Sequence, residues 1–333
     1  MTTSSRTWVL ATLLLLSANC QSVDSNEPSL RSAFGGVPLA AIRDSVPIGP
    51  SQSLILTRPH FSAVEIATIA RAMATVVGEE DLPPVDAIPP EQFASFEEAA
   101  KAVEGRVWLT MEAGEQKLGF ELYPQKPAIR VGVMDRSKPN FTAAGTYPGV
   151  GRDMALLSAR RCADVLAELD VIAASSYLPE PVLERAQGSS FPAVDDPEAK
   201  VEVTDHYHFV FGQAPNGILL GNSELTIDVD AHSGECFRIE VDFIEQQQGR
   251  AVDLIVSADA AKAAVEADIP STGGKKVVDE GRVVYWLEPE LASSEVEPRF
   301  VSSYTVVSEE GIAASPVPFA VLLSQEPPVI DEF

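Results

Sequence analysis

The stretch HYHFVFGQAPNGILLGNSELTIDVD, residues 206–230, decides the fold that we expect for this chain. On both sides of the central Asn216-Gly217 pair, apolar residues alternate with polar ones. A period of two places successive side chains on opposite faces of a β-strand. Asn-Gly is the preferred centre of a two-residue turn, because both central positions need a positive φ. The stretch therefore predicts an antiparallel hairpin with one buried face.

The polar face of this hairpin carries the candidate metal ligands His206, His208 and Asp228. Two imidazoles and a carboxylate can bind Zn²⁺. Simple pairing about the turn places His206 opposite Ile227, with the Asp228 carboxylate on a neighbouring rung. The same pairing places His208 opposite Leu225. We therefore favour the alternative, a solvent-facing sheet surface with modest His–Asp pairing, and expect neither a metal nor another cofactor.

The same stretch resembles the propeptide module of fungalysin- and thermolysin-type proteases. In that family, a strand ending in Gln is followed by an Asn-Gly or similar turn and by a strand that ends in Val-Asp. The matching residues here are Gln213, Asn216, Gly217, Ile218, Ser223, Glu224, Leu225, Val229 and Asp230. The chain departs from the pattern at Leu219, where Pro is usual, and at Gly221, where a bulky residue is common.

The resemblance also implies a binding surface and a fold. Propeptides of this family fold on the protease, assist its folding and block its cleft. The binding residues implied are Tyr207, Phe209, Gln213, Asn216, Gly217, Glu224 and Asp230. Residues 257–267, with Val283-Val284-Tyr285 after them, are similar to the PepSY module that follows such a propeptide. The resemblance implies an α+β fold of repeated cystatin-like units, each a helix packed on a curved antiparallel sheet.

Helical signals recur along the chain and favour α+β independently of the resemblance. Ser62 and Glu65 form a capping box at the start of an apolar-striped helix, and a similar box opens a helix over 95–105. A third helix is predicted over 154–170, and Ser257 is the predicted cap of a fourth. Alternating strands follow these helices, which indicates repeated helix-then-sheet units.

These patterns divide the chain into consecutive segments. The stretch over 178–199 is rich in Pro and Ser and is expected to be irregular. The expected segments are a signal peptide (1–19), a tether (20–33), an N-terminal α+β unit (34–150), a propeptide-like hairpin unit (151–250), a PepSY-like unit (251–325) and a disordered acidic tail (326–333).

The N-terminus predicts export. Arg6 precedes a compact apolar run over 8–16, which is shorter than the roughly 20 residues of a spanning helix. Ser17-Ala18-Asn19-Cys20 resembles a bacterial lipobox, although Asn19 stands where Gly, Ala or Ser is usual. We expect Cys20 to be lipidated, which would anchor the protein to a membrane of the bacterial cell envelope on its periplasmic or outer-membrane side. The alternative is ordinary cleavage near Ala18 and a soluble exported protein.

The net charge of the chain limits the class of partner that it can bind. The formal net charge of −25 argues against nucleic-acid binding, which needs a basic face.

If Cys20 carries lipid, Cys162 and Cys236 remain as an even pair in an oxidising compartment. The alternation places Cys236 on the side of Arg238, away from the apolar residues. A disulfide and two buried thiols therefore stay open as alternatives.

Catalytic motifs are missing from the sequence. It contains no His-Glu-x-x-His, no Gly-x-Ser-x-Gly and no phosphate-binding Gly-x-x-x-x-Gly-Lys loop. The aromatic residues Trp108, Tyr285, Trp286 and Tyr304 lie in alternating strands and are predicted to be core, whereas an exposed Trp would be an interface candidate.

We therefore expect a non-enzymatic exported binding protein that resembles a protease propeptide without its protease. Such a protein would inhibit a secreted metalloprotease, or modulate its folding, in trans. The alternatives are a scaffold lipoprotein for envelope assembly and an envelope-acting hydrolase with an unrecognised site.

Overall fold

The computed structural model shows an α+β protein in which antiparallel sheets predominate. It describes residues 48–77, 107–113, 116–123, 128–134, 136, 140–143, 149–173, 177–221, 223–267, 275–288, 291–307 and 315–332. The predicted signal peptide, the tether with Cys20 and the predicted helix over 95–105 lie outside these residues. Within the described part of the chain, no helix is long and apolar enough to cross a membrane.

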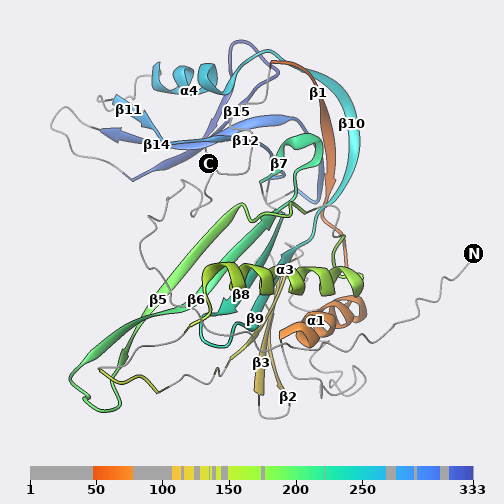
Figure 1. The fold of residues 1–333 in the computed structure, drawn as a ribbon. Helices are drawn as coiled ribbons and strands as arrows, with labels where there is room; N and C mark the ends of the chain where they lie inside the picture. The colour runs from red at the N-terminus through yellow and green to blue at the C-terminus, as the bar shows by residue number, and fades with distance from the viewer. Residues whose placement is uncertain are drawn as a thin grey trace, which may run out of the picture.

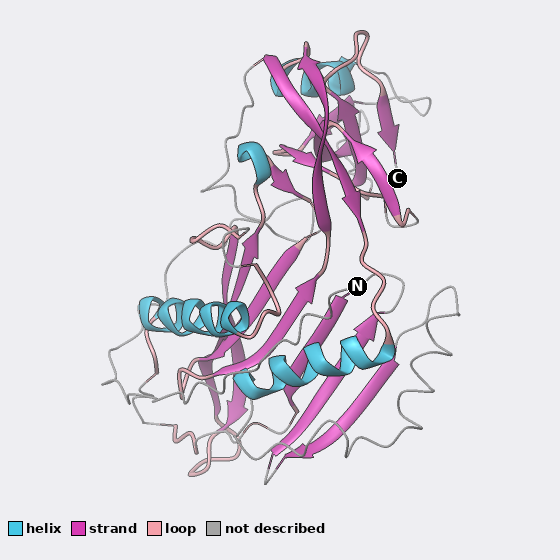
Figure 2. Ribbon diagram, turned by 90° about the vertical axis from the view of Figure 1, so that its right-hand side faces the viewer, coloured by secondary structure: helices cyan, strands magenta, loops and turns pink. Residues whose placement is uncertain are grey.

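A seven-stranded antiparallel sheet forms one half of the molecule (Figure 1). Its strands, in spatial order, are β2 (Val107–Ala113), β3 (Gln116–Tyr123), β4 (Ala128–Val133), β9 (Cys236–Asp242), β8 (Glu224–Asp230), β6 (Lys200–Gly212) and β5 (Leu183–Pro192). The helices α1 (Ala63–Val77) and α3 (Arg152–Glu168) both cover one face of this sheet (Figure 2).

The other half contains two smaller sheets and α4 (Ala258–Ala267). The larger of them runs in the order β16 (Ile330–Glu332), β15 (Val317–Leu322), β14 (Pro298–Val307), β12 (Arg282–Tyr285) and β7 (Leu219–Leu220), with β11 (Lys275–Val278) also paired to β14. The smaller one consists of β10 (Glu245–Leu254), β1 (Gly49–Thr57) and β13 (Ser293–Val296).

The predicted caps at Ser62 and Ser257 are confirmed in atomic detail, and the helix expected over 154–170 is found as α3, which begins at Arg152. Glu65 Oε2 accepts hydrogen bonds from the backbone N–H and the hydroxyl of Ser62, both at 2.8 Å. The Ser62 hydroxyl in turn accepts the Glu65 N–H at 3.3 Å, which completes a capping box. The Ser257 hydroxyl accepts the Ala260 N–H at 3.1 Å at the start of α4.

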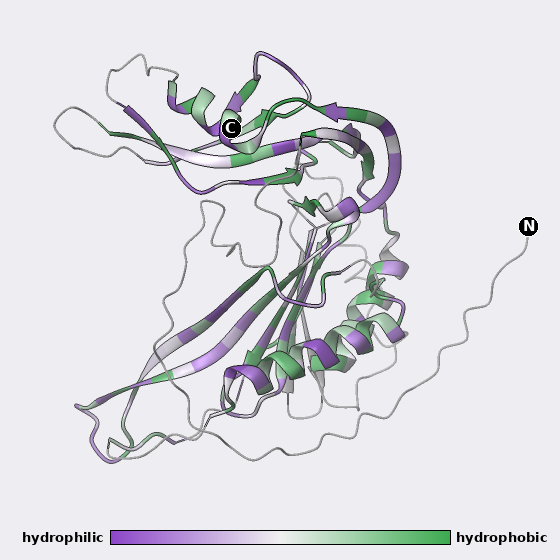
Figure 3. Ribbon diagram, turned by 45° about the horizontal axis from the view of Figure 1, so that its top comes forward, coloured by the Kyte–Doolittle hydropathy of each residue, from purple (hydrophilic) through white to green (hydrophobic). Residues whose placement is uncertain are grey.

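The core of the first half lies between the helices and the seven-stranded sheet. Apolar and polar residues are interspersed along its strands (Figure 3), and the buried apolar residues of β3, β4, β6, β8 and β9 form this core with the helices. Met73 of α1 and Leu166 of α3 are fully buried there, together with Phe209 of β6. Tyr285 and Tyr304 are core residues of the other half, as the sequence predicted.

The central hairpin prediction is wrong in its turn and its register. The strands β6 and β8 do pair antiparallel, but Gly212 pairs with Glu224 and the chain between them leaves the sheet. Asn216 and Gly217 sit in a short 3₁₀ turn within this excursion. The excursion continues into β7, which pairs in parallel with β12 of the other half. The three consecutive apolar residues over 218–220 explain this path, because such a run is typical of a strand that is buried on both faces.

The excursion joins the two halves through tight packing. Leu219 lies so close to β6 that a Cβ atom on Gly212 would be 2.5 Å from Leu219 Cδ1. Leu219 and Val210 share an apolar cluster with Val284 of β12, and Leu220 is fully buried in the core of the other half. Burial of the two leucine side chains stabilises the contact by roughly 3 to 6 kcal/mol.

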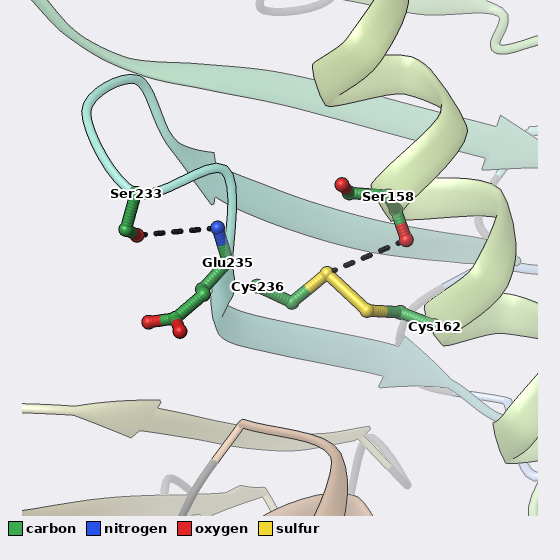
Figure 4. Close-up of a disulfide and its surroundings, with 5 residues drawn as sticks. All are labelled: Ser158, Cys162, Ser233, Glu235 and Cys236. Carbon is green, nitrogen blue, oxygen red and sulfur yellow. Dashed lines mark hydrogen bonds between the residues drawn. A yellow bond between two sulfur atoms is a disulfide. The ribbon is translucent and has the colours of Figure 1, made fainter. Parts of the chain in front are cut away.

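A β-bulge explains why the cysteines form a disulfide. Asp228 pairs with Arg238 and Val229 pairs with Cys236, so Phe237 is an extra residue in β9. The extra residue reverses the alternation and turns Cys236 toward α3. There it bonds to Cys162, which lies one turn beyond Ser158 on the helix (Figure 4). Regular alternation predicted the wrong side of the strand for Cys236, because a bulge cannot be recognised from the alternation of residues.

Two expected segment boundaries do not match the sheets. β4, from the predicted N-terminal unit, pairs with β9, from the predicted hairpin unit, so the two share one sheet. β1, from the same N-terminal unit, pairs with β10 and β13 in the other half. Each pairing covers a strand edge that a separate unit would leave open to solvent.

Two segments that were expected to be irregular contain strands. The stretch over 178–199 includes β5. In the C-terminal tail, β16 pairs with β15. The Glu332 carboxylate accepts a hydrogen bond from the Tyr304 hydroxyl at 2.7 Å and lies 3.4 Å from Lys276 Nζ, which explains why the tail docks.

We predict that the double substitution Cys162→Ala and Cys236→Ala lowers the free energy of unfolding by about 4 kcal/mol, because the bond closes a long loop between positions 74 residues apart. Chemical denaturation of the oxidised protein and the variant measures this difference. Reduction of the wild-type protein should reproduce most of it. Equal stability of all three samples would contradict the proposed role of the bond.

Candidate functional site

Two of the implied binding residues cannot contact a partner. Tyr207 and Phe209 lie on the face of β6 that α3 covers, and both are buried in the core. Burial raises the pKa of the Tyr207 phenol, as expected for an acid removed from water. The hairpin surface inferred from the resemblance is therefore a packing surface at these positions.

The implied residue Gln213 is also a structural contact. It is buried, and its side-chain oxygen accepts a hydrogen bond from Gln246 Nε2 at 3.3 Å. Gln213 also forms a hydrogen bond with the Tyr177 hydroxyl. Burial raises the pKa of Tyr177 to about 12, although this hydrogen bond acts in the opposite direction. Asn216 and Gly217 are exposed, and their φ values of 57° and 77° lie in the left-handed region, outside the range of a regular 3₁₀ helix.

The outer face of the seven-stranded sheet, opposite α1 and α3, carries the polar side chains of the sequence prediction. A second bulge shapes it, since Gln187 pairs with His206 and Gly188 pairs with Thr204, which leaves Asp205 as an extra residue in β6. Asp205 and His206 consequently turn to the same face, and His206 Nδ1 lies 3.0 Å from Asp205 Oδ2.

Arg136 connects the two bulges. Its guanidinium donates hydrogen bonds to Asp205 at 2.8 Å and to Asp230 at 2.5 Å, and it stacks 3.8 Å from the centre of the Phe237 ring. Asp230 Oδ1 also accepts the backbone N–H groups of His232 and Ser233 in the turn after β8. The Asp230 carboxylate is thus fully engaged in holding the fold.

His208 and Asp228 lie directly opposite each other, not on neighbouring rungs as the simple turn predicted. His208 Nδ1 lies 2.6 Å from Asp228 Oδ1, and Arg238 pairs with the other carboxylate oxygen. The Asp228 side chain is 0% exposed, so both of its oxygens need these partners. The register explains the difference, because the excursion after Gly212 shifts β8 along β6.

The chemistry available to these groups is limited. A histidine held through Nδ1 by a carboxylate keeps Nε2 as a proton acceptor. Among the described residues, however, no hydroxyl or thiol donates a hydrogen bond to His208 Nε2. In the same part of the chain, no three His, Cys, Asp or Glu side chains are grouped to hold a metal ion. His206, His208 and Asp228 do not form a trio, because His206 pairs with Asp205.

A second row of charges continues across the outer face. Arg130 donates to Glu240 at 2.7 Å and to Glu121 at 2.8 Å. Burial lowers the pKa of Arg130, but the ion pairs with Glu240 and Glu121 raise this pKa by a larger amount. The pKa of Arg130 therefore lies above its usual value. This row holds strands β3, β4 and β9 together through their side chains.

An exposed apolar patch lies beyond this row, at the β2 edge. Trp108 is 50% exposed and Met134 is 43% exposed, which corrects the prediction that Trp108 belongs to the core. Both side chains lie over Gly119, where a Cβ atom would be 3.1 Å from Met134 Cγ and 3.4 Å from Trp108 Cζ2. We call Trp108 and Met134 the Trp108 patch. Gly119 of β3 pairs with Gly132 of β4. A glycine in each of these two strands is the sequence signal that could have revealed the exposed patch.

We predict that Arg136→Met lowers the free energy of unfolding by about 3 to 5 kcal/mol, because it removes the cation that pairs with two buried carboxylates, Asp205 and Asp230. The matched control is Arg160→Met, since Arg160 pairs with Glu180 on the surface and such pairs contribute at most about 1 kcal/mol. Urea denaturation of both variants measures the difference. Equal destabilisation would show that the Arg136 network contributes no more than a surface pair.

Comparisons with known proteins give no function. No protein-family model matches the sequence, and no curated protein sequence matches it. A solved structure of an uncharacterized protein from Eubacterium rectale ATCC 33656 is similar, with 9% sequence identity and a TM-score of 0.44. The similarity covers 88% of this chain and 89% of that chain.

Proposed function

We propose that this chain is a non-enzymatic, exported protein-binding protein and that the Trp108 patch is its contact surface. The observation that carries the proposal is the half-exposed Trp108 beside the exposed Met134. Tryptophan is enriched among the residues that dominate binding energy at protein interfaces, and methionine adapts to partners of different shape.

The rest of the outer face supports this choice of surface. Asp228, Asp230 and Asp205 are buried beneath the arginines with which they pair. A partner that displaced these arginines would remove the cations that pair with buried carboxylates, which is unfavourable. The Trp108 patch can be covered without breaking any of these three ion pairs.

The family resemblance suggests the first partner to test, a secreted metalloprotease that the chain would inhibit or help to fold in trans. The order of elements is consistent with repeated cystatin-like units, because α1 precedes β2–β4, α3 precedes β5–β9, and α4 precedes β11–β16. In this proposal, two units share the seven-stranded sheet, and the N-terminal segment provides export and the lipid anchor at Cys20.

We predict that Trp108→Ala weakens binding of the partner roughly 30-fold, the effect of losing about 2 kcal/mol at a central interface residue. The protein would be cross-linked to partners in the envelope and secreted fractions of its own cells, and a recovered metalloprotease would be titrated for binding and inhibition. The matched control is Ile255→Ala, since Ile255 is 46% exposed and lies in the other half.

Binding that Trp108→Ala leaves unchanged would contradict the proposed surface. Recovery of envelope assembly proteins, with no protease bound or inhibited, would instead support the scaffold alternative.

The hydrolase alternative has one specific observation in its favour, the His208–Asp228 pair. Any hydrolytic activity on envelope polymers that His208→Gln abolishes, in a variant of unchanged stability, would replace the binding proposal by the hydrolase.

A further inference from the structure

The strand β5 is the edge of the seven-stranded sheet that lies farthest from the Trp108 patch. In the described part of the chain, β5 pairs with β6 alone. The two strands extend together beyond the rest of the sheet as a two-stranded arm (Figure 1). An edge strand presents backbone N–H and C=O groups that can pair with another extended chain.

The centre of β5 lacks the features that usually protect such an edge. Residues 186–190 read AQGSS and contain no charged residue and no proline. All of them except the half-buried Ser189 are exposed. The bulge in this ladder lies at Asp205 of β6, so the outer edge of β5 contains no extra residue. A Cβ atom on Gly188 would meet only the Val203 carbonyl oxygen, at 3.6 Å.

The charge of the arm limits the kind of chain that would pair with it. The exposed acidic residues of the arm are Asp195, Asp196, Glu198 and Glu202. Lys200 is the one basic residue among the described residues 186–204. A second copy of this protein would bring another net charge of −25 to the edge, which opposes pairing between copies. A basic segment would be attracted instead.

We propose that the edge of β5 binds an extended, lysine- or arginine-rich peptide segment by strand addition. Main-chain hydrogen bonds to 186–190 would supply affinity, and the acidic arm would select basic partners. This surface is separate from the Trp108 patch, since β2 and β5 are opposite edges of the same sheet. The two proposals can therefore fail independently.

The first test is amide hydrogen exchange of the full protein with a synthetic acetylated, amidated peptide of sequence Lys-Val-Lys-Thr-Lys-Val. We expect the peptide to slow exchange within 186–190 about tenfold, and added salt to weaken the effect. A peptide with Glu in place of every Lys should have no effect. A peptide with Pro at its second and fourth positions should also fail, because Pro cannot donate to a strand ladder.

Edge variants then separate this site from other surfaces. Gln187→Lys with Ser190→Lys should weaken peptide binding about tenfold, because both changes add positive charge to the edge. The matched control is Gln247→Lys with Gln248→Lys on β10, at two exposed positions of another edge strand. Trp108→Ala should leave the peptide affinity unchanged.

Any of four results would overturn the proposal. The first three are unchanged exchange over 186–190, equal binding of the Glu peptide, and a loss of binding in the β10 control that equals the loss in the β5 variant. Self-association of the wild-type protein that the β5 variant abolishes would also overturn it, because the edge would then bind a second copy.

Discussion

The insertion of Leu219 and Leu220 beside β12 is the contact on which the arrangement of the molecule depends. It takes the middle of one sequence stretch out of the seven-stranded sheet and makes it the edge strand of another sheet. Because Gly212 has no side chain, Leu219 can approach β6 closely enough to continue one apolar cluster into the other half. The same excursion sets the β6–β8 register, and that register brings His208 and Asp228 together.

The two bulges that flank β8 determine what the sheet presents on each face. The extra residue at Phe237 turns Cys236 toward α3 and places the aromatic ring under Arg136. The extra residue at Asp205 brings a second carboxylate to the same guanidinium. The polar cluster is consequently a buried, internally paired network that stabilises the fold. The surfaces that we propose for partners, the Trp108 patch and the β5 edge, lie outside it. In this account, partners bind at the two opposite edges of the seven-stranded sheet, β2 and β5, and the polar cluster at the centre of the sheet is structural.

Much of the fold could be predicted from local sequence, because caps and periodicity are local properties. The capping box at Ser62 and Glu65 and the cap at Ser257 are found as expected, as are most of the strands and the α+β class. Long-range pairing could not be predicted. An Asn-Gly pair between alternating strands favours a tight hairpin, and only the apolar run over 218–220 indicated that the chain had another strand to form. The binding residues drawn from the resemblance failed at Tyr207 and Phe209, because alternation does not say which face a helix covers. The exposure of Trp108 could not be read from its strand, since its surroundings come from β3 and β4.

The most direct test of this account is calorimetric unfolding of a variant in which residues 213–223 are replaced by Asn-Gly. This change joins Gly212 to Glu224 by the two-residue turn that fits their pairing, so the seven-stranded sheet keeps its register. The account predicts that the wild-type protein unfolds in one cooperative transition and that the variant unfolds in two, because the halves lose the strand that couples them. A single transition of the variant at the wild-type temperature would contradict it.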